Sequence, residues 1–330
     1  MNRRTTCDIR ILFAVAFAAT LGFDTGAHAQ AYPSRPITMV VPYPAGGPTD
    51  TLARIVTERM RISLGQSIII ENVSGAGGNI GVGRVARAAP DGYTFGIGQV
   101  SSHVFSGAVY TLQYDLLKDL EPVAMLTTAP MWIIAKNALP ANLKGLLDWL
   151  WANPDKASFA TVGIGGPAHL CGVYFQNKTG TRFQFVPYRG AAPAMQDLLA
   201  GQIDLTCLEA SNSLPQVRSG QIKAYAVLAR TRWAPAPNIP TIDEAGVPGL
   251  YIPFWHGFWA PRGTPKHAIA KLNKATVETL ADPAVHQRLV DMGQEIPPRE
   301  QQTPEALGVF QKAEIEKWWP IIKAANIKGE

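Results

Sequence analysis

Short apolar runs alternate with longer amphipathic stretches along most of the chain. The first pair is a β-rich apolar run at 37–41 and a stretch at 52–60 whose apolar residues recur at helical spacing. Repetition of this pair is typical of an open α/β sheet. The pattern predicts strands at 37–41, 67–71, 93–98, 121–126, 131–135, 158–161, 183–186, 203–207, 224–228 and 252–260, a short helix ending at Arg87, and helices at 52–60, 143–152, 168–178, 192–200, 266–280, 283–292 and 304–325.

Three turns between a predicted strand and a predicted helix are rich in Gly, Pro and Ala, at 42–50, 162–168 and 187–193. Small residues let a ligand approach the backbone, and the N-terminus of the following helix attracts anions. In open α/β sheets such turns lie at the edge where ligands bind. We expect Thr49 or Asp50 to cap the first of these helices. Three such turns without a catalytic constellation favour a receptor for small carboxylates.

The N-terminus has the pattern of a Sec-type signal peptide. A start containing arginines precedes an apolar run at 11–23. Ala27 and Ala29 follow, at the two positions before the cleavage site where a signal peptidase recognises small residues. The apolar run is shorter than the ~20 residues that span a bilayer. We expect residues 1–29 to be removed and the mature protein to be soluble and periplasmic.

Composition and motifs narrow the function. With 47% hydrophobic and 17% charged residues the chain is globular, and its net charge of +5 is spread without a basic block, so no nucleic-acid partner is expected. The sequence lacks a nucleophile elbow, a Walker A motif and metal-ligand spacings. The segment GVGRVA at 81–86 fits a dinucleotide fingerprint, but a long glycine loop separates it from the preceding strand. We therefore expect no enzyme activity, no metal and no cofactor; a periplasmic hydrolase would need a nucleophile and base that the sequence does not display.

Two cysteines remain after the signal peptide, Cys171 and Cys207. In an oxidising compartment they could form a disulfide. The interpretation that we prefer from the sequence is two separate small buried apolar residues.

The mature chain carries an ordered set of motifs: YPSRPI at 32–37, VPYPAGGPTD at 41–50, ENVSGAGGNIG at 71–81, APDGYT at 89–94, PYRG at 187–190, PA at 193–194, DLLAGQID at 197–204 and APRGTP at 260–265. This ordered set resembles the Bug family, the periplasmic solute receptors of tripartite tricarboxylate transporters. The resemblance covers essentially the whole mature chain.

The resemblance implies an α/β type II periplasmic-binding-protein fold, with two lobes and a ligand cleft between them. One lobe is expected at 32–130 plus 254–330 and the other at 131–253, with crossings at 127–130 and around Pro253. Members of the family bind small carboxylates, including di- and tricarboxylates, acidic amino acids and some aromatic acids. The resemblance also implies membrane permease subunits as partners, and we expect a monomer.

Carried onto this sequence, the family's binding loops fall at 43–50, 98–106, 161–169 and 188–192. Asp50 has the alternative role of a helix cap, and His169 that of a structural residue. Arg189 could pair with a carboxylate through two hydrogen bonds, and its alternative role is that of a solvated hinge residue. The candidate ligand-binding residues are Tyr43, Gly46, Gly47, Thr49, Asp50, Ser101, Ser102, Thr161, Gly165, Gly166, His169, Tyr188, Arg189 and Ala191.

Several positions depart from the family's pattern. Gly166 and Pro167 stand where serines are frequent, and Ser106 replaces a frequent asparagine. Leu208 and Glu209 occupy the place of an Asp-Asn pair, which argues against an acidic amino acid as ligand. We expect Glu209 at a cleft rim or on the surface, with selection of an amine or amide as the alternative.

Aromatic residues are plentiful near the expected crossings. We expect Trp255 and Trp259 to pack in the protein core. The alternative is that their rings stack against an aromatic acid in the ligand site. These aromatic residues slightly favour an aromatic or long-chain carboxylate over citrate as the ligand. They are Trp132, Phe254, Trp255, Phe258 and Trp259.

The sequence thus predicts a receptor that captures a small organic carboxylate by lobe closure and delivers it to a membrane transporter. The alternative is a receptor that presents its ligand to a sensor kinase or to uptake regulation.

Overall fold

The computed structural model describes residues 32–329, so the expected signal peptide lies outside the described residues. Residues from Arg35 onward form one compact unit. Within the described part, no helix combines the length and apolar character needed to cross a bilayer.

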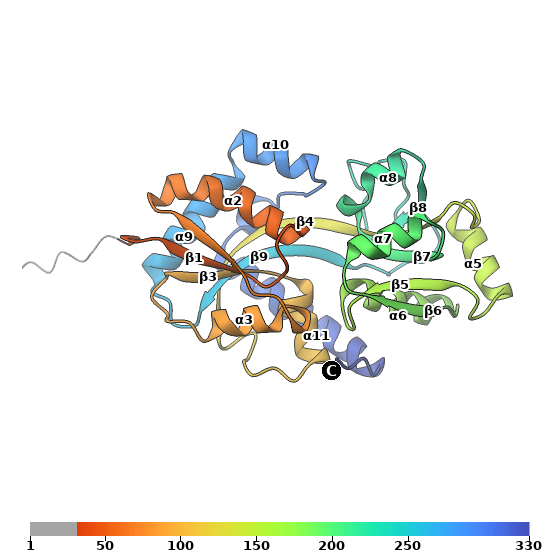
Figure 1. Cartoon of the computed structure of the whole chain (residues 1–330), viewed down its shortest axis with the longest axis horizontal. Helices are drawn as coiled ribbons and strands as arrows, with labels where there is room; N and C mark the ends of the chain where they lie inside the picture. The colour runs from red at the N-terminus through yellow and green to blue at the C-terminus, as the bar shows by residue number, and fades with distance from the viewer. Residues whose placement is uncertain (1–31, 330) are drawn as a thin grey trace, which may run out of the picture. The chain divides into compact units, whose positions relative to one another are not determined.

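Strands and helices alternate through most of this unit (Figure 1). The strands are β1 (Ile37–Val41), β2 (Ile68–Asn72), β3 (Thr94–Gln99), β4 (Leu120–Lys136), β5 (Ser158–Val162), β6 (Gln184–Tyr188), β7 (Leu205–Glu209), β8 (Ile222–Val227) and β9 (Pro253–Pro261). The helices are α2 (Pro48–Leu64), α3 (Asn79–Ala86), α4 (Ser106–Val109), α5 (Leu143–Ala152), α6 (Pro167–Thr179), α7 (Ala191–Leu199), α8 (Leu214–Arg218), α9 (Lys266–Leu280), α10 (Pro283–Asp291) and α11 (Pro304–Ala324), with the short η2 (Ser101–Phe105) before α4.

The long strand β4 joins two groups of paired strands. Its residues 120–130 pair with β9, which also pairs with β3, and β3, β1 and β2 continue in parallel. Its residues 131–136 pair with β7 and β8, and β7, β5 and β6 continue in parallel. The strand order is β2-β1-β3-β9-β4-β7-β5-β6, with β8 on β4.

The two strands predicted at 121–126 and 131–135 form one continuous strand, so the predicted break at 127–130 is wrong. The pairing of residues 127–130 with β9 is regular, and the two register shifts lie ahead of it, after Pro122 and after Met125. Pro130 has no N–H to donate, and it lies where β4 changes partners, a position that does not need the missing donor. The other predicted strands and helices are present; those at 37–41, 143–152 and 266–280 have the predicted ends, and the rest have shifted ends.

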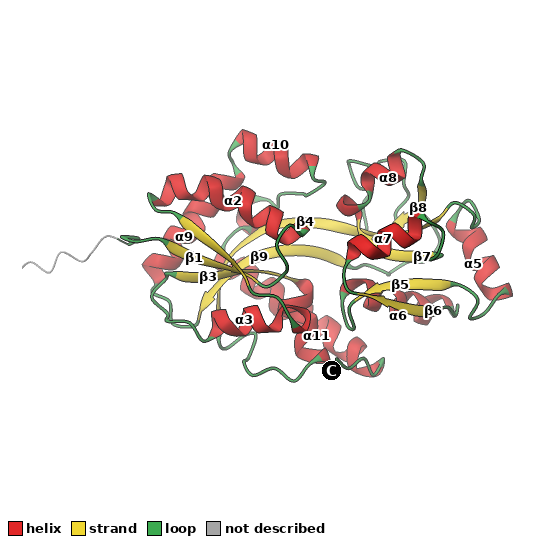
Figure 2. Ribbon diagram, viewed as in Figure 1, coloured by secondary structure: helices red, strands yellow, loops and turns green. Residues whose placement is uncertain are grey.

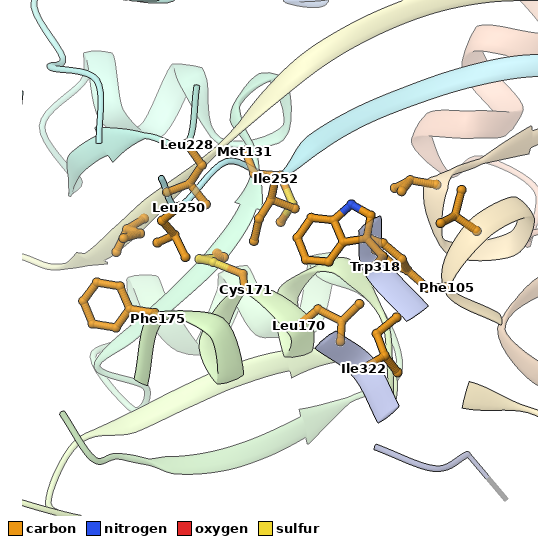
Figure 3. Close-up of a cluster of buried hydrophobic side chains, with 14 of the residues drawn as sticks. Phe105, Met131, Leu170, Cys171, Phe175, Leu228, Leu250, Ile252, Trp318 and Ile322 are labelled. Atoms are coloured by element: carbon orange, nitrogen blue, oxygen red, sulfur yellow. A yellow bond between two sulfur atoms is a disulfide. The ribbon is translucent and has the colours of Figure 1, made fainter. Parts of the chain in front are cut away.

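Helices cover the strands of both groups (Figure 2). In the first group, α2, α9 and α10 pack together on one side, while α3 and α11 lie on the other. Trp318 of α11 makes edge contacts with Phe105, 5.3 Å away, and with Tyr174 of α6, 6.0 Å away between ring centroids. Figure 3 shows Trp318 and Ile322 beside Leu170, so the C-terminal helix packs against both groups.

A disulfide joins Cys171 of α6 to Cys207 of β7, with the Cα atoms 6.2 Å apart. Our preferred interpretation of two separate apolar residues is therefore wrong, and the alternative of a disulfide is confirmed. The bond fastens α6, which begins at one of the glycine-rich turns, to the strand next to β4.

Trp255 and Trp259 are fully buried, which confirms their packing role. The indole of Trp259 stacks on His103 with 3.8 Å between ring centroids and donates a hydrogen bond to Gln311, 3.0 Å away. These rings belong to the core and leave little aromatic surface for a ligand.

Candidate functional site

Each of the three glycine-rich turns leads into a helix whose N-cap is a glycine. The N-caps are Gly47 for α2, Gly166 for α6 and Gly190 for α7, and none makes a side-chain capping bond. The first N–H groups of these helices are therefore left without side-chain partners, which suits them to an anionic ligand. The expectation that Thr49 or Asp50 caps the first helix is wrong, because the helix begins at Pro48, a residue favoured at the first helical position.

Three other helices are capped by side chains, whereas α3, α4, α8 and α9 are not. Asn142 accepts a hydrogen bond at the start of α5, Asp282 at the start of α10 and Thr303 at the start of α11. A side-chain cap typically contributes ~1 kcal/mol. The three glycine turns lack this stabilisation, which leaves their first N–H groups without a side-chain partner.

Asp50 holds the first turn in place. Its carboxylate accepts hydrogen bonds from the Gly46 amide at 2.8 Å, from Arg54 at 2.9 and 3.1 Å and from Asn72 at 2.9 Å. Burial disfavours the charged form, but these hydrogen bonds outweigh it and lower the pKa of Asp50. The carboxylate is thus neutralised by protein groups, and Asp50 holds the turn without capping the helix.

Tyr43 connects the first turn to the loop after β3. Its hydroxyl lies 3.1 Å from Ser101 Oγ, and burial raises the pKa of this phenol. A Cβ added at Gly78 would lie 3.4 Å from the Tyr43 hydroxyl and 3.3 Å from Ser102, so the glycine loop after β2 borders the same region. The structure therefore brings Tyr43, Ser101 and Ser102 together, as the resemblance implies.

The hydroxyls of Ser102 and Thr49 are used inside the protein. Ser102 Oγ lies 3.0 Å from His103 Nδ1 and bonds the Gln99 backbone, and Thr49 Oγ1 lies 3.2 Å from His256 Nε2. Both serve first to position the loops that carry them.

The second turn meets the first group of strands and helices at residues 109 and 110. Tyr110 donates a hydrogen bond from its hydroxyl to the Ile164 carbonyl, 3.3 Å away. Gly165 has φ +68°, and a Cβ there would lie within 2.6 Å of Val109, so only glycine fits. Tyr110 also borders Gly77, where an added Cβ would lie 3.4 Å from its ring.

His169 fixes the shape of the second turn. Its Nδ1 accepts a hydrogen bond from the Gly165 amide at 3.0 Å, and its ring meets Phe185 edge to face. Burial lowers the pKa of His169, so the imidazole is neutral and can accept this bond. Gly166 precedes it as the N-cap, and Thr161 is buried in β5.

The third turn adjoins the second through paired strands. The Gly163 amide donates to the Tyr188 carbonyl at 3.3 Å, and the Tyr188 hydroxyl donates to Asp197 at 2.6 Å, which raises the pKa of Tyr188 to about 12. Arg189 is exposed, and within residues 32–329 its guanidinium makes no ion pair or hydrogen bond. Ala191 begins the following helix. The site thus has one cationic side chain that is not already neutralised by a neighbour.

Three buried polar residues beneath the first turn were not singled out from the sequence. His256 of β9 contacts Thr127 of β4 through Nδ1, at 3.4 Å, in addition to Thr49. Burial lowers the pKa of His256 to about 3, so the ring is neutral. Gln99 of β3 stands directly opposite His256. The sequence could have revealed them, because each is a polar residue inside an otherwise apolar strand.

Glu209 lies in the interior and not at a rim or on the surface, so that expectation is wrong. It is 4% exposed, and its carboxylate accepts hydrogen bonds from Gln294 and from Ser211, 2.8 Å away. Burial raises the pKa of Glu209. Its partners explain why a carboxylate can occupy this position. Among the described residues, no cluster of His, Cys, Asp and Glu could hold a metal ion.

Comparisons with known proteins agree with the fold. The model of the tripartite tricarboxylate transporter family receptor, TctC, matches residues 52–327. Protein BugT of Bordetella pertussis is 33% identical over 315 residues, which cover 94% of this chain and 96% of BugT.

Solved structures match over nearly their whole length. The periplasmic binding protein BugD is 41% identical, with a TM-score of 0.82 over 90% of this chain and 100% of BugD. MatC from Rhodopseudomonas palustris, solved with bound malate, is 38% identical, with a TM-score of 0.81 over 88% of this chain and 100% of MatC. Rpa4515 of R. palustris, solved with adipate, is 34% identical, with a TM-score of 0.82 over 90% and 99%. The chain therefore has the α/β periplasmic-binding-protein fold and belongs to the TctC/Bug family of periplasmic solute-binding receptors of tripartite tricarboxylate transporters, a family of binding proteins and not of enzymes.

Proposed function

We propose that this protein captures a small organic dicarboxylate between two lobes, residues 32–130 plus 254–330 and residues 131–253, and delivers it to the permease of a tripartite tricarboxylate transporter. The observation that carries the proposal is the continuity of the glycine turns. Tyr43 borders Gly78, Gly77 borders Tyr110, and Tyr110 bonds Ile164 in the second turn. We take the uncapped N-termini of α2 and α6 to face the region that these contacts connect.

Backbone N–H groups at these helix starts bind one carboxylate of the ligand. Each helix terminus contributes ~0.3–1 kcal/mol, and more when it is partly buried. Such neutral donors suit a receptor that must release its ligand, because a buried ion pair carries a large desolvation penalty. The remaining candidate residues of the turns, Gly46, Gly47, Gly165 and Gly166, give the ligand access to the backbone.

Arg189 binds the second carboxylate. Its guanidinium is exposed and unpaired among the described residues, and a planar guanidinium can grip a carboxylate with two parallel hydrogen bonds. This assignment favours a ligand with two acidic groups. The bound malate of MatC and the adipate of Rpa4515 are both dicarboxylates, which supports the same class here.

Ligand binding shifts the population toward a closed form in which the 163–166 turn contacts residues 109 and 110. The Tyr110–Ile164 hydrogen bond joins residues of the two proposed lobes and is a contact that closure would form. An aromatic acid has less support as the ligand, since Trp255 and Trp259 lie in the core. We also propose that the mature protein acts in the periplasm after removal of its signal peptide.

Calorimetric titration of residues 30–330 with malate, succinate, adipate and benzoate tests the proposal. We expect micromolar binding of at least one dicarboxylate, which corresponds to about −8 kcal/mol. Arg189→Gln should weaken it at least tenfold, whereas Arg182→Gln, which removes an exposed arginine already paired with Asp155, should leave it unchanged. Absence of heat and of a thermal shift with every acid would overturn the proposal.

A second experiment separates delivery to a transporter from presentation to a sensor kinase. Cells carrying the permease subunits should take up the labelled acid only when this receptor is present. Normal uptake without the receptor, together with loss of ligand-dependent transcription, would favour the sensory role.

A further inference from the structure

Gln99 carries a buried hydrogen-bond acceptor that the protein does not use. The residue is 8% exposed, and its side-chain oxygen Oε1 has no hydrogen-bond partner among the described residues. Leaving such an oxygen unpaired in the interior is unfavourable, because it has lost its hydrogen bonds to water. A group that donates a hydrogen bond to this oxygen when the ligand is bound would offset this cost.

The position of Gln99 in the sheet places this amide at the proposed ligand site. Along β3, Gln99 shares a face with Phe95 and Ile97, both buried. On the neighbouring strand β9, His256 stands opposite Gln99. Polar residues therefore replace apolar ones on this face at the end of β3, where the strand enters the loop containing Ser101.

The amide of Gln99 faces Tyr43. The Gln99 side chain lies close to the Tyr43 hydroxyl, as do those of Ser101, 3.1 Å away, and Ser102. Gln99 Oε1 is the side-chain oxygen left without a hydrogen-bond partner within the described residues. Its neighbour Tyr43 connects the first turn to the loop after β3.

The chemistry of a free carbonyl oxygen restricts what it can bind. It repels a carboxylate and accepts a hydrogen bond from a hydroxyl or an ammonium group. An ammonium would need a negative counter-charge. Asp50 is neutralised by Arg54, and Glu209 bonds Gln294 and Ser211. His256 is neutral, so the surroundings of Gln99 suit an uncharged donor.

We propose that Gln99 Oε1 accepts a hydrogen bond from a hydroxyl group of the ligand, so that the receptor selects hydroxylated dicarboxylates over their unsubstituted analogues. The inference rests on the proposed function and names the ligand class within it. Sites with buried polar groups discriminate strongly against an analogue that leaves those groups unpaired.

Calorimetric titration with three matched pairs tests the inference: malate and succinate, 2-hydroxyglutarate and glutarate, and 2-hydroxyadipate and adipate. In the pair of suitable length, the wild-type protein should bind the hydroxylated acid at least tenfold more tightly. Gln99→Met keeps the length of the side chain but removes the acceptor, so it should reduce the preference to less than threefold. The variant Gln113→Met, at an exposed position, should keep the full preference.

The affinity ratio within a pair is the deciding measurement, because general damage to the site would weaken both acids alike. Equal wild-type affinity for both members of the preferred pair would overturn the inference and leave the proposed function intact. An equal loss for both acids in Gln99→Met would also overturn it, since Gln99 would then act on the carboxylate or only position Tyr43. Failure of every acid to bind the wild-type protein would instead overturn the proposed function itself.

Discussion

The hydroxyl of Tyr110 donates a hydrogen bond to the carbonyl oxygen of Ile164, 3.3 Å away. This bond joins two segments more than fifty residues apart in the chain, the end of the loop after β3 and the turn before α6. It gives the proposed closed form a contact that can be removed by deleting a single oxygen atom.

The substitution Tyr110→Phe should weaken ligand binding about 2- to 10-fold, because one net hydrogen bond is worth ~0.5–1.5 kcal/mol. Calorimetric titration measures the change. Tyr114→Phe is the matched control, because its hydroxyl bonds Asn79 at 3.4 Å without reaching the 163–166 turn. Equal losses in the two variants would show that the bond to Ile164 has no part in closure.

The substitution Gly47→Val should reduce ligand affinity more than tenfold while leaving the melting temperature almost unchanged. Gly47 has φ −75°, which any residue adopts, and a Cβ there would be 3.4 Å from the Pro44 carbonyl, an ordinary contact. The added methyl groups would cover the first N–H groups of α2. Gly308→Val, on α11, serves as the control, and unchanged affinity in Gly47→Val would remove this turn from the site.

Loss of the disulfide should lower the free energy of unfolding by about 3–4 kcal/mol, as expected for a loop of this length. The two cysteines are 36 residues apart. Urea unfolding of the Cys171→Ala/Cys207→Ala double variant measures the loss. In the presence of a reductant, the wild-type protein should have the same free energy of unfolding as the variant. A wild-type unfolding curve that the reductant does not change would contradict the prediction.

The substitution Glu209→Gln should stabilise the protein at neutral pH by about 1 kcal/mol, the worth of one hydrogen bond regained, here to the unpartnered Gln294 oxygen. Burial raises the pKa of Glu209 above the usual value of ~4.3, so the folded state holds this proton longer than the unfolded state. Stability of the wild-type protein therefore falls as the pH rises from ~4.3 through the raised pKa.

The advantage of Glu209→Gln should accordingly grow from pH 4 to pH 8 in urea unfolding experiments. Glu300→Gln, at an exposed position, is the control and should show no such trend. An advantage that shrinks over this pH range would contradict the assignment of a raised pKa.

Most of the architecture could be predicted from the sequence, because the strand and helix periods are local properties of the chain. The break predicted at 127–130 failed because β4 is held by partners from distant segments, and those partners override the local preference of a proline for a turn. The cap of α2 was misjudged for a related reason. Asp50 lies inside the helix and bonds back to Gly46, so the same side chain that resembles a cap serves another role.

The candidate site was predictable only as far as its composition is unusual. Glycine turns stand out in a sequence, and the structure connects them through Tyr43 and Tyr110. Gln99 and His256 did not stand out, since each is a single polar residue in an apolar strand and their pairing depends on strands that are far apart in the chain. Glu209 was misplaced because its partner Gln294 lies 85 residues away.

The shared strand β4 has a consequence for how the protein can be divided. One continuous segment supplies hydrogen bonds to β9 at one end and to β7 and β8 at the other, so neither group of strands keeps all its neighbours if the chain is cut there. Separately expressed halves would each expose an unpaired edge and associate or aggregate. The two groups of strands should therefore fold and unfold together, even though the ligand would be held by two parts.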